Sequence, residues 1–295
     1  MQDITSLIKE TAARVEARLN ELLPDETVQP ASLHKAMRYS IFAGGKRIRP
    51  LLCIESAKAC GATEEDALNA ACALEVLHTY TLIHDDLPCM DNDDLRRGRP
   101  TNHKVFGEGV AVLAGDALLT EAFAILARVP ANDRYTVGDY VAEFAYRTGS
   151  LNLVGGQVLD LEGEGRALSV EELRAIHHGK TSALIMASTR LGGMVAGCTQ
   201  EQLDALTAYG RDLGLAFQII DDILDVTSSP EVLGKSIGKD AAVQKATYPS
   251  LVGLEQARAE ARDLTASARA ALDVFSPKRR ETLLAINDFL LSRDY

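Results

Sequence analysis

The chain has 295 residues, 46% of them hydrophobic and 25% charged, which is enough apolar material for a large core in a water-soluble protein. Its formal net charge of -11 at pH 7 argues against a nucleic-acid binder and against docking on anionic lipid, since both need a basic face. No apolar run approaches the roughly eighteen residues of a membrane span, and the five scattered cysteines suit a reducing cytoplasm. We therefore expect a soluble cytoplasmic protein.

Helix signals dominate from the start of the chain. Residues 1–23 are amphipathic and contain acids, which is typical of a surface helix and not of a signal peptide. Capping pairs then open helices at Thr63, Ser169 and Thr199, and small and apolar residues follow each at three- and four-residue spacing. We expect the glycine pair at 192–193 to end the second of these helices.

Strand signals are few. The chain has no tryptophan, 5% aromatic residues and only short β-branched runs. Long Ala- and Leu-rich segments joined by short loops predict an all-α helical bundle, with a single domain over residues 1–295. The irregular stretch with a functional composition is 228–250, which has too many Gly, Ser and Lys residues for a core helix.

The first acidic cluster follows an apolar run, in LIHDDLPCMDNDDLRRGRP at residues 82–100. Pro88 disfavours helical geometry in the residue before it, so the chain can turn there and bring Asp91 back beside Asp85 and Asp86. The C-terminal end of a helix is its negative pole, so acids at this position are doubly unfavourable without a cation.

The second acidic cluster lies inside a predicted helix, in AFQIIDDILDV. Asp221 and Asp225 are four residues apart and share one helix face, with Asp222 beside them. The flanking apolar residues indicate a buried helix, in which bare carboxylates are costly. Mg²⁺ typically binds through one or two carboxylates together with substrate phosphates. Two clusters, each at the end of an apolar run, therefore favour paired Mg²⁺ sites over solvated helix ends.

Basic residues supply the counterpart in this acidic chain. The AGGKRIRP segment places two glycines before Lys46 and Arg49, while Arg96 and Arg97 directly follow the first acidic cluster. His78 precedes that cluster on roughly the same helix face, about 10 Å away. Further candidate phosphate contacts are Lys180, Thr181, Gln218, Lys235, Lys239 and Lys245. We expect a diphosphate bound between carboxylate-bound metals and these basic groups. The apolar segments before the two acidic clusters indicate that the rest of the substrate is a hydrocarbon chain.

Six motifs resemble, in order, those of the trans-isoprenyl diphosphate synthases: GGKRIRP, LIHDDLPCMDNDDLRRGRPTNHKVFGE, LAGDALL, GKTSAL, FQIIDDILD and GKSIGKDAAVQKATYP. The resemblance runs from about residue 30 to the C-terminus. It implies an isoprenoid synthase-type helical bundle around a central cavity, assembled as a homodimer. It also implies a cofactor of about three Mg²⁺ ions, held with the diphosphate.

Carried over by position, the resemblance implies metal ligands in both acidic clusters, at Asp85, Asp86, Asp91, Asp221, Asp222 and Asp225. It implies isopentenyl diphosphate contacts at Lys46, Arg49, His78 and Arg97. It implies allylic diphosphate contacts at Arg96, Lys180, Thr181, Gln218, Lys235 and Lys245. All of these except Lys245 are also implied to be catalytic. In the implied reaction the allylic C–O bond ionises with metal assistance. The double bond of isopentenyl diphosphate then attacks the carbocation head-to-tail, and the released diphosphate takes the proton.

Two features bear on the length of the product. Pro88 and Cys89 widen the first motif to DDxxxxD, as in bacterial farnesyl and in bacterial or plant geranylgeranyl enzymes. Tyr80 and Thr81 stand about 6–8 Å up the helix from Asp85, so Tyr80 forms a floor if the growing tail runs along this helix. We expect farnesyl diphosphate, made from dimethylallyl or geranyl diphosphate. Geranylgeranyl diphosphate is the alternative, because the motif wording is closer to those synthases, and Tyr80 could also be ordinary core packing.

Other classes stay open at this point. His84 and Asp85 could form the dyad of a metal-dependent phosphohydrolase, although His177 and His178 are a poor match for its further histidines. A terpene cyclase normally mixes Asn, Ser or Thr and Glu in its second site, unlike DDILD. A non-catalytic prenyl-synthase subunit would be expected to lack some of the acids or cations that are present here.

Overall fold

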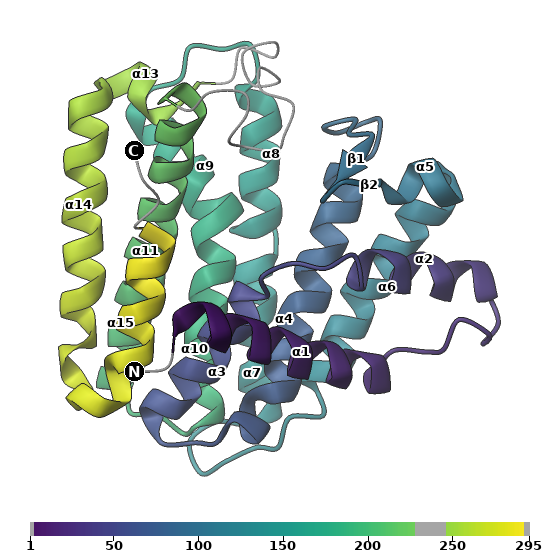
Figure 1. Cartoon of the computed structure of the whole chain (residues 1–295), viewed down its shortest axis with the longest axis horizontal. Coiled ribbons are helices and arrows are strands. Elements are labelled where there is room, and N and C mark those ends of the chain that lie inside the picture. The colour runs from purple at the N-terminus through teal and green to yellow at the C-terminus, as the bar shows by residue number, and fades with distance from the viewer. Residues whose placement is uncertain (1–2, 228–245, 292–295) are drawn as a thin grey trace.

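The computed structural model describes residues 3–227 and 246–291, and these are almost entirely helical (Figure 1). The first helices are α1 (Ile4–Leu22), α2 (Ala31–Ile41), α3 (Ile48–Cys60), α4 (Glu64–Asp85), α5 (Asn102–Phe106), α6 (Glu108–Leu126) and α7 (Val137–Thr148). The later ones are α8 (Leu153–Gly163), α9 (Val170–His177), α10 (Ala183–Val195), α11 (Gln200–Thr227), α13 (Tyr248–Val252), α14 (Leu254–Ala271) and α15 (Pro277–Leu291). The prediction of an all-α bundle is confirmed.

A short hairpin supplies the strands of the described part of the chain. β1 (Leu95–Arg96) pairs antiparallel with β2 (Arg99–Pro100), directly after the first acidic cluster. The low aromatic and β-branched content predicted this scarcity of strands. That residues 1–295 form one domain stays a prediction.

The three predicted helix starts are formed by their side chains. At the start of α4, the Asp66 N–H donates to Thr63 Oγ1 at 3.3 Å, and the Thr63 N–H donates to the Asp66 carboxylate at 2.8 Å. Ser169 forms the same reciprocal pair with Glu172 at the start of α9. Thr199 accepts from the first turn of α11 in the same way. Each pairing satisfies N–H groups that a helix start leaves without partners.

The second predicted helix is interrupted by a π-helical turn over His178–Ser182, which joins α9 to α10. A Cβ added to Gly179 would lie 2.7 Å from the Cα of Gly156 in α8, so the two backbones meet without room for a side chain. Helical spacing alone predicts one uniform helix here, because the contact that accompanies the turn comes from a distant segment.

The prediction that Gly192 and Gly193 end this helix is wrong. Both glycines lie inside α10, which continues to Val195. A Cβ on Gly192 would lie 2.1 Å from the carbonyl oxygen of Cys53, so this glycine lets α10 pack closely against α3. The chain leaves the helix at Gly197, where φ is +66°.

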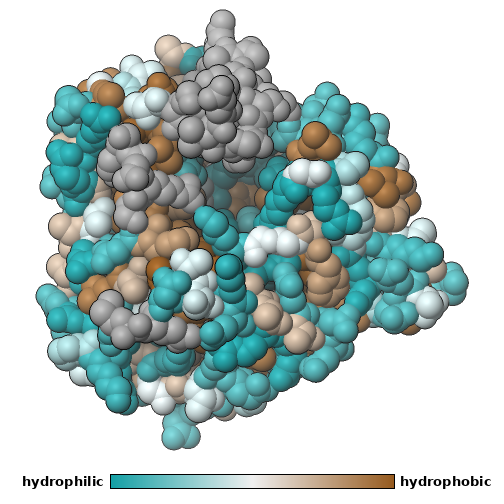
Figure 2. All heavy atoms as spheres, viewed as in Figure 1, coloured by the Kyte–Doolittle hydropathy of each residue, from teal (hydrophilic) through white to brown (hydrophobic). Residues whose placement is uncertain are grey.

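The helices build two adjoining hydrophobic clusters. One is centred on α4, α6 and α10, and the other on α11, α14 and α15. Figure 1 shows the hairpin, α8 and α13 at the same end of the bundle. Figure 2 shows the molecule hollowed at that end, with hydrophilic side chains around the opening. Both acidic clusters lie near this end because α4 and α11 terminate there.

One described helix, α6, is long and apolar enough to cross a membrane by length and composition, so the expectation that no run approaches that length is wrong. Buried core helices of water-soluble proteins can have the same length and apolar composition. Here α6 packs against α4 and α2, and Asp116 and Glu121 interrupt its sequence. Its 18-residue apolar window is 39% buried, which leaves much of the helix open on one side.

Candidate active site

The first acidic cluster turns back on itself after α4. Beyond Asp86 the chain makes a tight turn through Pro88, and the Asp91 N–H donates to the Asp85 carbonyl at 2.8 Å. The negative charge of Asp91 contributes to the raised pKa of Asp85, so the two carboxylates act on each other. The return of Asp91 to the end of the helix, expected from the proline, is therefore present.

Asp86 is buried and already paired. Arg96 of β1 donates its Nε to both carboxylate oxygens at 2.8 and 2.9 Å, and its Nη2 to Oδ1 at 2.6 Å. The hairpin positions Arg96, since the left-handed backbone of Arg97 and the following Gly98 turn β1 back into β2. Burial raises the pKa of Asp86, and the guanidinium opposes that rise. The first site therefore contains its own counter-charge.

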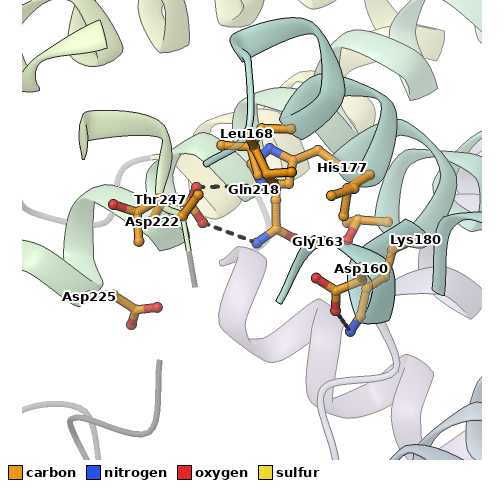
Figure 3. A pocket seen from close by; sticks show the side chains of 13 residues that line it. Asp160, Gly163, Leu168, His177, Lys180, Gln218, Asp222, Asp225 and Thr247 are labelled. Atoms are coloured by element: carbon orange, nitrogen blue, oxygen red, sulfur yellow. Dashed lines mark hydrogen bonds and ion pairs between the residues drawn. The ribbon is translucent and has the colours of Figure 1, made fainter. Parts of the chain in front are cut away.

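The second acidic cluster opens into a pocket of about 130 Å³ (Figure 3). Asp222 is buried at its wall, where it accepts the Tyr248 N–H at 2.8 Å and the Gln218 Nε2 at 3.5 Å. The Nε2 of His177 lies 3.5 Å from the same carboxylate. Burial raises the pKa of Asp222 to about 7, the hydrogen bonds oppose the rise, and the other two acids of the cluster add to it.

The other acids of this cluster lie at different depths. Asp225 is exposed and lines the pocket, whereas Asp221 is half-buried. Both charges act on Asp222, so the three carboxylates form one electrostatic group. Their carboxylate oxygens are hard donors of the kind that Mg²⁺ prefers.

The π-helical turn places two predicted contacts in this pocket. Lys180 Nζ donates to the Asp160 carboxylate of α8 at 2.6 Å (Figure 3). Thr181 Oγ1 donates to the Gln218 side chain at 2.8 Å. These two bonds join α8, the π-helical turn and α11 around the pocket. The turn therefore positions a cation and a hydroxyl side by side at its wall.

Lys180 links the two acidic clusters. It lines the pocket with Asp222, and its positive charge also acts on Asp85 at the end of α4. Burial raises the pKa of Asp85 to about 6, and the charge of Lys180 is the largest effect that opposes the rise. Lys180, which lines the pocket with Asp222, is therefore near enough to the end of α4 for its charge to act on Asp85.

The predicted isopentenyl diphosphate contacts gather around the loop between α2 and α3. Arg49 Nη1 lies 3.2 Å from His78 Nε2, and Arg97 donates to the Gly44 carbonyl. Burial, together with Arg49 and Arg97, lowers the pKa of His78 well below its ordinary value, so the ring is neutral. Lys46 is exposed above the ring of Phe289, with its Nζ 5.3 Å from the centroid.

The predicted chain-length residues point in different directions. Tyr80 is buried, and its ring meets His84 edge-on with centroids 5.6 Å apart. His84 in turn reaches the Val112 carbonyl of α6 at 3.0 Å. Thr81 is half-buried and donates its hydroxyl to the His78 carbonyl at 2.8 Å, within its own helix. A role of Tyr80 in product length stays a prediction.

Sequence reasoning did not assign to this site three residues that contact its charged groups. Asp160 pairs with Lys180, Tyr248 supplies an N–H to Asp222, and His177 lies against the same carboxylate. Burial lowers the pKa of His177 to about 4, which makes it neutral at pH 7. For Asp160, the available sequence signal was an aspartate that follows the apolar run of α8. Lys235, Lys239 and Lys245 lie outside the described residues.

The acidic side chains could hold a metal ion only together with other ligands. Within residues 3–227 and 246–291, no three His, Cys, Asp or Glu side chains converge tightly enough to hold an ion by themselves. Desolvated carboxylates beside a basic pocket instead fit an ion that keeps waters and shares its shell with substrate phosphates. The six predicted ligands all lie among the described residues and would hold such ions: Asp85, Asp86, Asp91, Asp221, Asp222 and Asp225.

The polyprenyl synthetase family model matches residues 30–274 of the chain. A chloroplastic geranylgeranyl pyrophosphate synthase from Capsicum annuum is 47% identical over 97% of this chain and 78% of its own length. A geranylgeranyl diphosphate synthase from Cyanophora paradoxa is 46% identical over 95% of this chain and 93% of its own.

Solved structures show the same architecture. An FPP/GFPP synthase from Zymomonas mobilis superposes with a TM-score of 0.87 at 36% identity, covering 98% of both chains. A geranylgeranyl pyrophosphate synthetase from Pyrococcus horikoshii superposes with a TM-score of 0.88 at 31% identity, covering 99% of this chain and 98% of the other. The expected helical bundle of isoprenoid synthases is thereby confirmed.

Proposed function

The chain belongs to the polyprenyl synthetase family and is a trans-prenyltransferase, and we propose that it joins isopentenyl diphosphate to allylic diphosphates to make geranylgeranyl diphosphate. The observation that carries this proposal is the position of Lys180, which lies with Asp222 in the pocket while its charge acts on Asp85. A diphosphate held there is within reach of both acidic clusters.

Two separate groups of side chains bind the two diphosphate substrates. The allylic diphosphate lies near Lys180, Thr181 and Gln218, while the basic groups around His78 hold isopentenyl diphosphate. Mg²⁺, when bound to the aspartates, supplies Lewis acidity toward the leaving diphosphate. Lys180 and Arg96 stabilise the negative charge that develops as the C–O bond breaks. Because His78 is neutral, it can donate one hydrogen bond to a phosphate oxygen without adding a charge.

Geranylgeranyl diphosphate is preferred over farnesyl diphosphate as the product. Relatives covering most of the chain at 46–47% identity are named geranylgeranyl synthases. The farnesyl expectation depended on Tyr80 as a floor, and its ring packs against His84. The Zymomonas mobilis protein, named an FPP/GFPP synthase, keeps farnesyl diphosphate as the alternative.

The decisive experiment is a product assay. Purified protein is incubated with Mg²⁺, labelled isopentenyl diphosphate and dimethylallyl, geranyl or farnesyl diphosphate in turn, and chain length is read by mass spectrometry. We expect all three primers to give the twenty-carbon diphosphate. Accumulation of the fifteen-carbon product, with farnesyl diphosphate unused as a primer, would support the alternative.

The same preparation separates the rival classes. A phosphohydrolase would release phosphate from a phosphate ester without isopentenyl diphosphate. A non-catalytic subunit would make no product alone but would raise the activity of a second synthase. EDTA should abolish prenyl transfer, and Mg²⁺ should restore it, because the carboxylates lack another way to hold a diphosphate.

We also propose a homodimer. The described part of the chain leaves large apolar side chains exposed on neighbouring helices: Val112 and Leu113 of α6, Tyr146 of α7, and Val154, Val158 and Leu159 of α8. Leu113 is 59% exposed, which is unusual for an apolar helix unless a partner covers it. Light scattering should give twice the mass of the chain, and Leu113→Glu should shift it toward the monomer. A monomeric wild-type protein would contradict this.

A reducing, cytoplasmic location is proposed as well. All five cysteines are free thiols, and Cys89 is exposed. Free exposed thiols persist in reducing compartments. Fractionation of the source cells, with detection of the chain in the cytosolic fraction, tests this location.

A further inference from the structure

The loop before α3 has an unusual backbone. Gly44 and Gly45 have φ of +85° and +134°, and Arg47 has a φ of +49° although it is not glycine. Side chains other than glycine rarely adopt this left-handed region, so surrounding contacts must hold Arg47 there. Arg47 immediately precedes the first residue of α3, so its conformation sets the direction in which that helix begins.

The side chain of Arg47 is buried in the bundle, where protein groups take up its hydrogen bonds. Its Nη1 donates to Glu75 Oε1 of α4 at 2.6 Å, and its Nη2 donates to Glu16 Oε1 of α1 at 2.9 Å. Nη2 also donates to the Ile41 carbonyl at the end of α2. The Arg47 side chain is 0% exposed and that of Glu75 is 2% exposed. One guanidinium thus ties three helices to the start of α3.

Unlike the buried Arg47 side chain, those of Lys46 and Arg49 are expected contacts of isopentenyl diphosphate. Lys46 is exposed, and Arg49 reaches His78 at 3.2 Å. A Cβ on Gly45 would lie 2.7 Å from the guanidinium of Arg97, so the loop backbone also makes room for that side chain. The residues that surround the expected isopentenyl diphosphate therefore depend on the position of this short loop.

Glu75 connects the buried pair to the same group of cations. It lies three residues before His78 on α4, which places the two on one face of the helix. Its negative charge acts on both Arg49 and Arg97 as well as on Arg47. A buried carboxylate in this place limits repulsion among the three arginines before a diphosphate arrives.

We propose that Arg47 and Glu75 form a buried positioning pair that holds the 43–49 loop in the geometry required to bind isopentenyl diphosphate. This inference rests on the proposed function. Arg47 is a positioning residue, since its guanidinium contacts other protein groups and acts on substrate only through Lys46 and Arg49. A 1 Å displacement of binding groups can cost up to about a hundredfold in rate, so loss of the pair should be visible in substrate binding.

The test is a set of variants with the pair removed in two ways. Arg47→Met leaves Glu75 buried without its partner and should lower both thermal stability and binding. The double variant Arg47→Met with Glu75→Met removes both charges together and should recover part of the thermal stability, because no buried carboxylate is left without its guanidinium, although Arg49 and Arg97 lose the charge of Glu75. We expect the double variant to keep a KM for isopentenyl diphosphate raised about tenfold, with the KM for the allylic primer within about twofold of wild type.

A milder variant tests the same role if the double variant does not fold. Arg47→Lys keeps the charge beside Glu75 but cannot bridge three acceptors at once. We expect it to fold and to raise the KM for isopentenyl diphosphate about threefold to tenfold. A stable double variant or a folded Arg47→Lys variant with wild-type KM for isopentenyl diphosphate would overturn the positioning role. Equal increases in KM for both substrates would overturn it as well.

A matched control is the ion pair between Arg14 and Glu64, 2.6 Å apart, which also joins α1 to α4 but lies at the surface. Arg14→Met should leave both KM values unchanged. The wild-type assay separates this inference from the proposed function. A wild type that makes no prenyl product counts against the function, whereas an active wild type with unaffected variants counts against the positioning pair alone.

Discussion

The two acidic clusters look alike in sequence but differ in how the protein stabilises them. At the end of α4, Asp86 is neutralised by three hydrogen bonds from Arg96. At the end of α11, Asp222 is held by neutral donors, the Tyr248 N–H and the Gln218 amide. At the first site a guanidinium therefore offsets part of the burial of Asp86, whereas at the second site neutral donors alone oppose the burial that raises the pKa of Asp222 to about 7.

This difference changes what a metal must do at each site. At the first site, an ion would compete with the Arg96 guanidinium for Asp86, and Arg96 could then bind a phosphate. At the second site, an ion would have to replace the proton that burial favours on Asp222. Two acidic motifs of similar sequence can therefore be stabilised without metal in two ways, by an ion pair at Asp86 and by neutral hydrogen-bond donors at Asp222.

The largest effect is expected from removing a carboxylate at either site. Asp85→Asn and Asp222→Asn should each lower kcat by about a thousandfold, because metal-assisted ionisation needs both sides of the hollow. Steady-state kinetics at saturating Mg²⁺ measures this, with the exposed loop variant Asp94→Asn as the control. A loss confined to one site would break the symmetry between the clusters.

The pH dependence of stability should distinguish the sites next. Asp222 has a folded-state pKa of about 7, against an ordinary value of 3.8, so the folded protein holds this proton more tightly than the unfolded chain. Its stabilising contribution is fully present below pH 3.8 and is lost as the pH rises through 7. Without metal, the free energy of unfolding should fall by about 2–3 kcal/mol from this group between pH 5 and pH 8.

Urea unfolding in EDTA at the two pH values measures that loss. Asp222→Asn should flatten the pH dependence, whereas Asp86→Asn should change it less, because Arg96 already offsets part of the burial of Asp86. An unchanged slope in Asp222→Asn would show that the proton is held elsewhere.

Breaking the paired site should cost more stability than breaking the neutral one. Arg96→Met leaves the buried Asp86 carboxylate without its guanidinium and should lower the free energy of unfolding by about 1–2 kcal/mol, less than for a fully buried pair because Arg96 is 31% exposed. Gln218→Leu removes a weak neutral hydrogen bond and should cost under about 1 kcal/mol. Denaturant unfolding of both variants without metal decides the order.

The smallest expected effect is a change of product, and it uses a difference upstream of the two clusters. Five residues before Asp85 stands Tyr80, whereas five residues before Asp221 stands the small Ala216. If the tail runs along α4, Tyr80→Ala should lengthen the products by about one isoprene unit, with little change in the rate of primer use. Mass spectrometry of the products checks this, with the exposed Val28→Ala as the control. An unchanged product distribution would remove Tyr80 as a floor.

Local signals predicted much of this structure, and long-range contacts account for the remainder. The caps at Thr63 and Ser169 are neighbours of the residues they bond, so sequence alone revealed them. The partner of Lys180 is Asp160, twenty residues away on another helix, and nothing in their spacing indicates the contact. Gly192 was mistaken for a helix stop because its use, close packing against Cys53, is visible only in three dimensions.

The π-helical turn at His178–Ser182 constrains the length of the chain as well as its shape. Such a turn contains one more residue than the α-helical path it replaces. Deleting a residue there would restore ordinary helical winding and shift the side chains that remain in the turn by up to about 100° around the helix axis. Lys180 and Thr181 would then no longer face the residues they bond. The segment should therefore tolerate no insertion or deletion during evolution or engineering.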